Sequence, residues 1–202
     1  VALSKTKKAE KIQYRSFDTR PLIIGMGPSG LFCALYLAMH HANPIIYERG
    51  SCVEKRMKDV ETFFQGGPLD ENSNVQFGEG GAGTFSDGKL TSRSKDPRGR
   101  YVLEQFVRFG ADPAIVYQSH PHIGTDELVK IIKKMREEIL RLGGEIHFDH
   151  TLEDIQIEDG MIHQVQINGQ WLPCDDLLLG IGHSARDTFR MLNEKQVHCI
   201  AK

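Results

Sequence analysis

The sequence lacks the features that mark several classes of protein. Its four cysteines are scattered over 202 residues, with no close pair of the kind that zinc sites or disulfide frameworks use. Its longest apolar run, residues 31–39, is about half as long as a bilayer span needs to be. A net charge of −2 gives no overall attraction to nucleic acid or to an anionic membrane. We therefore expect a cytoplasmic protein with no metal site, and with neither nucleic acid nor a membrane as its partner.

What the chain does contain is a globular composition with an uneven spread of charge and glycine. Hydrophobic residues make up 40% and charged residues 26% of the chain, as in typical globular domains. Basic residues are concentrated in residues 1–19, which are expected to form a flexible lead-in, and residues 20–202 are expected to form one folded domain. Glycines gather between residues 66 and 88, where little periodicity is visible. Apolar residues within this stretch argue that it is a functional loop and not a disordered linker.

Hydrophobic periodicity predicts alternating strands and helices in the first part of the chain. Compact apolar runs predict buried strands at residues 20–24 and 45–48. Helical spacing predicts four helices, at residues 28–41, 51–64, 96–108 and 125–141. Ser51 is expected to cap the second of these helices through its hydroxyl group.

The second part of the chain has the pattern of short strands. Alternating segments joined by Asp-Gly and Asn-Gly turns predict an antiparallel meander around residues 155–173. A buried strand at residues 176–181 is expected to follow, and then a last helix that Ser184 caps. Together the two parts predict an α/β fold.

A dinucleotide fingerprint follows the first predicted strand. Gly25, Gly27 and Gly30 lie between that strand and the first helix, and Pro28 and Ser29 open the helix. In this position the glycines make a tight turn, let the backbone approach a pyrophosphate and let the helix pack on the strand. The N–H groups at the helix start would then face the phosphates.

The residue that ends the second strand completes this pattern. Glu48 stands where a carboxylate can accept hydrogen bonds from the hydroxyls of an adenosine ribose. The same charge would repel a 2′-phosphate, although the neighbouring Arg49 weakens that argument against NADP. The fingerprint alone does not separate NAD from FAD, but a meander in place of further strand–helix units favours FAD. We therefore predict a Rossmann-like FAD-binding domain, in which a central parallel sheet with helices is joined to a three-stranded antiparallel β-meander.

A second glycine motif nearly matches a P-loop. Gly83, Gly88 and Lys89 have the spacing of G-x-x-x-x-G-K-[ST], but Leu90 stands where the magnesium-binding hydroxyl belongs. Because no strong strand precedes the motif and no clear helix follows it, nucleotide hydrolysis is the weaker interpretation. The alternative is a flavin cradle, in which the backbone of Gly80, Gly81, Ala82 and Gly83 lies against the cofactor. Lys89 is then a candidate to stabilise the reduced flavin, or a solvent-facing lysine.

A third glycine turn lies at residues 180–185. As a second fingerprint for NAD it has too little sequence after it to supply a further strand and a ribose-binding acid. We interpret it instead as the turn after a strand that runs back past the cofactor. Gly182 and His183 would then lie at the cofactor, with His183 either a proton donor or a residue that only caps the turn.

Several segments together resemble one family of proteins. The segments "IIGMGPSGLFCALYLA", "VEKR", "LDENSNVQFGEGGAGTFSDGKLTSR" and "GIGHSARDTFRML" are similar to those of the bacterial FAD-dependent dehydrogenases described as NAD(FAD)-utilising. The resemblance implies FAD as cofactor, with the fingerprint glycines on the pyrophosphate, Glu48 on the ribose and the backbone near Leu152 on the adenine. It also implies NAD(P)H as a candidate electron donor. Related chains continue into a substrate domain and a closing segment, so the resemblance implies a truncated member.

Two functions follow from this resemblance. The first is an FAD-dependent oxidoreductase that transfers hydride through flavin N5 to or from an unknown small-molecule substrate. The second is a non-catalytic, truncated nucleotide-binding domain that binds FAD weakly or not at all. No acid–base pair stands out as catalytic, and the oligomeric state is left open.

Overall fold

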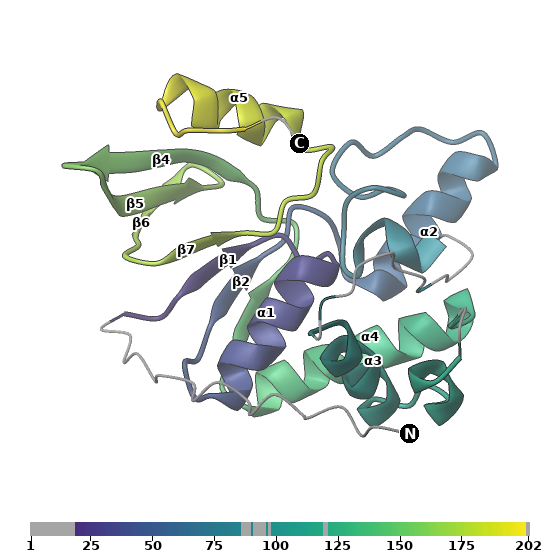
Figure 1. The fold of residues 1–202 in the computed structure, drawn as a ribbon. Helices are drawn as coiled ribbons and strands as arrows, with labels where there is room; N and C mark the ends of the chain where they lie inside the picture. Colours follow the sequence, from purple (N-terminus) through teal and green to yellow (C-terminus); the bar gives the residue numbers. More distant parts are fainter. Residues whose placement is uncertain (1–18, 86–89, 91–95, 97, 119–120, 201–202) are drawn as a thin grey trace.

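The structure is a computed structural model that describes residues 19–85, 90, 96, 98–118 and 121–200. Lys89, which the sequence offers as a flavin contact, lies outside the described residues. Within them, the chain forms two sheets and five α-helices (Figure 1). None of the described helices has the length and the apolar character that crossing a membrane requires.

The first sheet is parallel and has four strands in the order β3-β2-β1-β7. The strands are β1 (Leu22–Ile24), β2 (Ile45–Tyr47), β3 (Glu145–His147) and β7 (Leu177–Leu179). A parallel pair needs a crossover connection, which α1 (Pro28–Met39) supplies between β1 and β2. The sequence predicted β1, β2, β7 and this helix.

The second sheet is the antiparallel meander that the turn sequences predicted. It consists of β4 (Leu152–Glu158), β5 (Met161–Ile167) and β6 (Gln170–Pro173) in that order. Asp159 and Asn168, the first residues of the two turns, have φ of 50° and 46°. These left-handed values are those that Asp-Gly and Asn-Gly hairpin turns require. The fold class predicted from the sequence is therefore confirmed.

The remaining helices are α2 (Val53–Phe64), α3 (Arg98–Arg108), α4 (Thr125–Arg141) and α5 (Arg186–Glu194). Two short 3-10 helices, η1 (Gly81–Phe85) and η2 (Pro113–Val116), lie in the connections. In Figure 1, α1, α3 and α4 lie on one side of the parallel sheet, and the meander with α5 lies on the other. The parallel sheet is thus the middle layer of the molecule.

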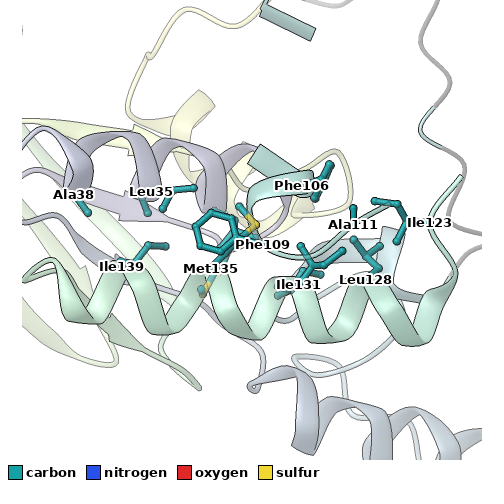
Figure 2. Close-up of a cluster of buried hydrophobic side chains, with 14 of the residues drawn as sticks. Leu35, Ala38, Phe106, Phe109, Ala111, Ile123, Leu128, Ile131, Met135 and Ile139 are labelled. Carbon is teal, nitrogen blue, oxygen red and sulfur yellow. The ribbon is translucent and has the colours of Figure 1, made fainter. Parts of the chain in front are cut away.

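Two hydrophobic cores cover the two faces of this sheet. Successive side chains of β1 point to opposite faces of the sheet and so contribute to both cores. Ile23 points into the helical core, while Leu22 and Ile24 point toward the meander. Figure 2 shows the helical core, in which buried side chains of α4 meet residues of α1 and of the segment from α3 to η2. Met135 and Ile139 of α4 are completely buried there. The two cores hold β1, β2 and β7 in one sheet, and the register of that sheet places the last residues of the three strands side by side.

Three sequence expectations about local structure are wrong. Ser51 does not cap α2, because the N-cap residue is Cys52 and the Ser51 hydroxyl donates to Asp149. Ser184 does not cap α5, whose N-cap residue is Ala185, without a side-chain hydrogen bond. The strand β7 is only half-buried, and Leu179 at its end is exposed. The reason is that β7 forms an edge of the sheet, with a hydrogen-bonded neighbour on one side only.

Candidate functional site

A cavity of about 430 Å³ opens where strands β1, β2 and β7 end. Its walls come from the turns after these strands, the start of α1, residues 76–82 and the start of β4. Ligands of open parallel sheets bind beyond the carboxyl ends of the strands. The volume lies within the range of cavities that hold small molecules and cofactors.

The helix α1 begins at this cavity without a capping side chain. Gly27 is its N-cap residue, Pro28 takes the first helical position, and the first turn contains no acid. Gly27, Pro28 and Ser29 all line the cavity. Because the first N–H groups of a helix have no intrahelical partner, they are left for a group in the cavity. This end of the helix dipole attracts an anion.

Two glycines of the fingerprint differ in what surrounds them. A Cβ on Gly30 would lie 1.8 Å from the carbonyl oxygen of Gly25, so the helix can approach the turn only because Gly30 has no side chain. A Cβ on Gly27 would meet nothing closer than the Cα of Gly81, at 3.8 Å. Gly30 therefore serves packing, whereas Gly27 keeps the floor of the cavity open.

Glu48 connects the turns that surround the cavity. Its Oε2 accepts from the N–H of Met26 at 2.5 Å, and its Oε1 accepts from the N–H groups of Gly50 at 2.8 Å and Gly78 at 3.0 Å. Although the residue is only 4% exposed, it lines the cavity. A carboxylate offers about four lone-pair positions, so three bonds leave one for a ligand.

The side chain of Arg49 closes one wall of the cavity. Its Nη2 donates to Asp187 at 2.9 Å and to the Thr188 hydroxyl at 3.2 Å, both at the start of α5. The guanidinium group also lies 4.6 Å from the centroid of the Phe77 ring, within range of a cation–π contact. The charge of Arg49 is thus paired with a carboxylate of the same chain.

The glycine loop, defined here as residues 66–85, is held in place by Arg56. This arginine of α2 is completely buried, and its guanidinium group lies 4.6 Å from the ring centroid of Phe85. It donates to the carbonyl oxygens of Asn74, Val75, Glu79 and Gly81 and to the Thr84 hydroxyl, at 2.7–2.9 Å. Burial lowers the pKa of Arg56 to about 10, so it remains charged at neutral pH. Arg56 therefore supplies partners to loop carbonyls that no sheet pairs.

A second buried ionisable side chain ties the loop to two helices. Glu79 has no exposed surface, and its Oε2 accepts from the N–H of Val53 at 2.8 Å and from Arg136 of α4 at 2.6 Å. Glu79 thus caps α2, the role that the sequence assigned to Ser51. Among the described residues its Oε1 has no hydrogen-bond partner. Burial raises the pKa of Glu79 to about 7, while the hydrogen bond from Arg136 lowers the pKa of Glu54 to about 2.

The connection from β3 to β4 forms another wall. His150 and Leu152 line the cavity there, and the N–H of His150 donates to the Glu48 carbonyl at 2.9 Å. The Nδ1 of His150 lies 2.7 Å from the carbonyl oxygen of Phe148. The imidazole ring therefore has a fixed orientation beside the residue predicted to bind ribose.

The third glycine turn, which follows β7, forms a further wall of the cavity. The N–H of Gly180 donates to the carbonyl of Ile24 at 2.7 Å, which places this turn next to the fingerprint turn. Gly182, with φ of 69°, and the exposed His183 line the cavity.

Most of the predicted cofactor-binding residues share this one cavity. The lining includes Gly25, Gly27, Pro28, Ser29, Glu48, Arg49, Gly81, Ala82, Leu152, Gly182 and His183. Gly30, Gly80 and Gly83 are not part of the lining; the Gly80 N–H donates to Met26, and a Cβ there would clash with Ile132. Their contact with a cofactor, and that of Lys89, stays a prediction.

The sequence analysis did not single out every residue of the lining. Phe77, Gly78, His150, Gly180 and Phe189 also line the cavity. Gly180 belongs to the glycine turn at residues 180–185, which the sequence analysis placed at the cofactor without naming this residue, and Gly78 belongs to the glycine-rich stretch. The rings of Phe77, His150 and Phe189 gave no signal, because their place depends on tertiary packing.

The described part of the near-P-loop motif and the residues before it do not have the structure of a P-loop. Residues 75–80 form no strand, and Gly83 lies within the 3-10 helix η1. A P-loop needs a strand directly before it. Gly88 and Lys89 themselves lie outside the described residues. Among the residues that the structure does describe, no group of three or more His, Cys, Asp or Glu side chains could hold a metal ion.

No protein-family model matches this chain. An uncharacterized protein of Clostridium beijerinckii is 50% identical over 183 residues, which are 91% of this chain and 34% of that protein. The chain therefore spans about a third of the length of this relative.

Solved structures of low sequence identity have a similar fold. THI4 of Thermovibrio ammonificans matches with a TM-score of 0.59 at 16% identity, over 89% of this chain and 64% of that one. An L-amino acid deaminase from Proteus vulgaris matches with a TM-score of 0.54 at 11% identity, over 86% and 56%. Glycine oxidase from Geobacillus kaustophilus matches with a TM-score of 0.52 at 11% identity, over 86% and 58%. The chain thus shares with these proteins a Rossmann-like α/β fold. It spans less than two thirds of each of these proteins.

Proposed function

We propose that this chain binds FAD in the cavity beyond β1, β2 and β7, as the FAD-binding part of an oxidoreductase. The observation that carries the proposal is the joint placement of Gly27, the uncapped start of α1 and Glu48 around one cavity. The fold shared with glycine oxidase and L-amino acid deaminase supports the same proposal.

The residues of the cavity fit the two ends of an adenosine diphosphate group. The bare Cα of Gly27 and the free N–H groups of α1 suit a pyrophosphate, which needs close backbone approach and carries negative charge. The remaining lone pair of Glu48 suits a ribose hydroxyl, which is a donor. The internal pairing of Arg49 leaves Glu48 to repel a 2′-phosphate, which favours FAD over NADP in this cavity.

When bound, a flavin supplies hydride transfer through its N5 atom, and the protein supplies position and electrostatics. In this chain Arg56 holds the glycine loop against the cavity, and Glu48 holds three turns at fixed distances. Gly182 and His183 line the cavity after β7. The substrate, and the use of NADH or NADPH as electron donor, are properties of a complete oxidoreductase. This chain spans about a third of the length of the Clostridium relative.

A titration with FAD tests the proposal. We expect the wild-type chain to bind one FAD and to quench its fluorescence. We expect Gly27→Ala to weaken binding at least about tenfold, because its methyl group would occupy the floor that the pyrophosphate needs.

A matched control comes from another helix. Gly124 is the N-cap residue of α4, also without a side-chain hydrogen bond, and a Cβ there would meet nothing within 4 Å. Gly124→Ala should therefore bind FAD like the wild type. Equal weakening by both substitutions, or a wild-type chain that takes up no FAD, would contradict the proposal. If FAD binds, bleaching of the flavin by NADH or NADPH without oxygen separates an oxidoreductase from a non-catalytic nucleotide-binding domain.

A further inference from the structure

The position of Glu48 defines where the base of a bound dinucleotide lies. If Glu48 holds the ribose, as in the proposed function on which this inference rests, the base attached to that ribose lies beside it. His150 is bonded to the Glu48 backbone at 2.9 Å and lines the same cavity. Its imidazole ring is therefore a candidate contact for the base.

The hydrogen bond inside the protein decides which kind of contact this ring offers. The carbonyl oxygen of Phe148 can only accept, so the Nδ1 atom that lies 2.7 Å from it must carry the proton. In the neutral ring the other nitrogen, Nε2, is then an acceptor without a proton. The rings of Tyr47 and His147, at centroid distances of 5.9 Å and 5.5 Å, pack beside the His150 ring.

An acceptor at this place distinguishes between purine bases. The exocyclic N6 amino group of adenine is a donor, whereas guanine carries the acceptor O6 at the same ring position. Hypoxanthine also has a carbonyl oxygen there, and otherwise has nearly the same shape as adenine.

We propose that Nε2 of His150 accepts a hydrogen bond from the adenine amino group, so that His150 selects adenine over bases with a carbonyl at that position. Leu152 lines the cavity two residues further on and offers apolar surface to the base. The sequence resemblance gave adenine contacts only to the backbone near Leu152.

The test compares the binding of ADP with that of inosine diphosphate by calorimetry. We expect the wild-type chain to bind ADP about tenfold more tightly, because inosine diphosphate offers no donor to the Nε2 acceptor of the half-buried His150. His150→Phe keeps a ring of similar size but removes the acceptor, and its affinity ratio should fall to near one. His147→Phe is the matched control, since His147 stacks on Tyr47 at 5.0 Å but is not part of the cavity lining. It should keep the wild-type ratio.

The ratio of the two affinities is unaffected by a general loss of folded protein, because both ligands would lose binding sites equally. A wild-type chain that binds FAD but shows no preference for ADP would overturn the role of His150 and leave the proposed function standing. A preference that persists in His150→Phe would overturn it as well. A wild-type chain that binds neither FAD nor ADP would overturn the proposed function, and the inference with it.

Discussion

At the scale of single residues, identical amino acids in one motif have different physical roles. Gly27 and Gly30 both belong to the fingerprint, but only Gly27 borders the cavity. Sequence spacing identified both glycines, yet it could not assign packing to one and ligand approach to the other. That assignment depends on the 1.8 Å and 3.8 Å distances that a Cβ would have to its neighbours.

This difference predicts that substitution by alanine lowers the free energy of unfolding much more at Gly30 than at Gly27. Gly30→Ala would force the α1 backbone away from Gly25, and overpacking of this kind costs about 1–3 kcal/mol of the free energy of unfolding, or more. Gly27→Ala has an ordinary helix N-cap conformation, with φ of −68°, and should cost less than about 1 kcal/mol. Urea unfolding followed by circular dichroism measures both values. Two variants of equal stability would show that the close approach of α1 to the turn is not needed.

At the scale of elements, the sequence predicted those helices whose own periodicity determines them. Helix α4 was predicted at residues 125–141 and is observed at Thr125–Arg141, because its apolar stripe and its stop at Gly143 are local signals. The cap of α2 was not predictable in this way. Its partner, Glu79, lies 26 residues beyond Val53 and reaches the helix only through the fold of the glycine loop.

The contribution that Glu79, which connects α2, α4 and the glycine loop, makes to the free energy of unfolding should depend on pH. Burial raises the pKa of Glu79 from 4.5 to about 7, so the folded protein binds a proton there that the unfolded chain has released. The stabilising contribution is complete below pH 4.5 and is lost as the pH rises toward 7, with a slope of up to about 1.4 kcal/mol per pH unit. Glu79→Gln removes this titration. Its free energy of unfolding should therefore depend less on pH than that of the wild type in this interval.

The neighbouring carboxylate provides the control for this measurement. The pKa of Glu54 is lowered from 4.5 to about 2, so its stabilising contribution is present above pH 4.5 and is lost as the pH falls toward 2. Glu54→Gln should change the pH dependence of unfolding only in that acid range. If Glu79→Gln and the wild type show the same slope between pH 4.5 and 7, Glu79 does not exchange a proton on folding there.

At the scale of the whole molecule, the cavity is assembled from segments that are far apart in the sequence. The fingerprint turn lies more than 100 residues from both the connection into β4 and the turn after β7. The three segments meet because β1 pairs with β2 and β7. The sequence identified the glycine turns and Glu48, since each has a local motif. It could not identify Phe77, His150 or Phe189, which become neighbours of the cavity only through packing.

The α/β fold with its meander was predictable from the sequence, whereas the contacts between side chains of different segments were not. Strand and helix periods, together with the Asp-Gly and Asn-Gly turns, determine the order of the layers. The internal pairing of Arg49 with α5 and the capping of α2 by Glu79 depend on side chains that meet across layers.

The central claim is that FAD binds in the cavity beyond the parallel strands, and hydrogen exchange measured by mass spectrometry with and without FAD tests it most directly. We predict slower exchange in the three segments that contribute most of the cavity lining, residues 25–30, 76–82 and 180–184, with no change in α3. A second cavity, of about 370 Å³, is lined by Asp59, Phe63 and Leu69. Protection confined to residues 59–71, with residues 25–30 and 180–184 unchanged, would contradict the account.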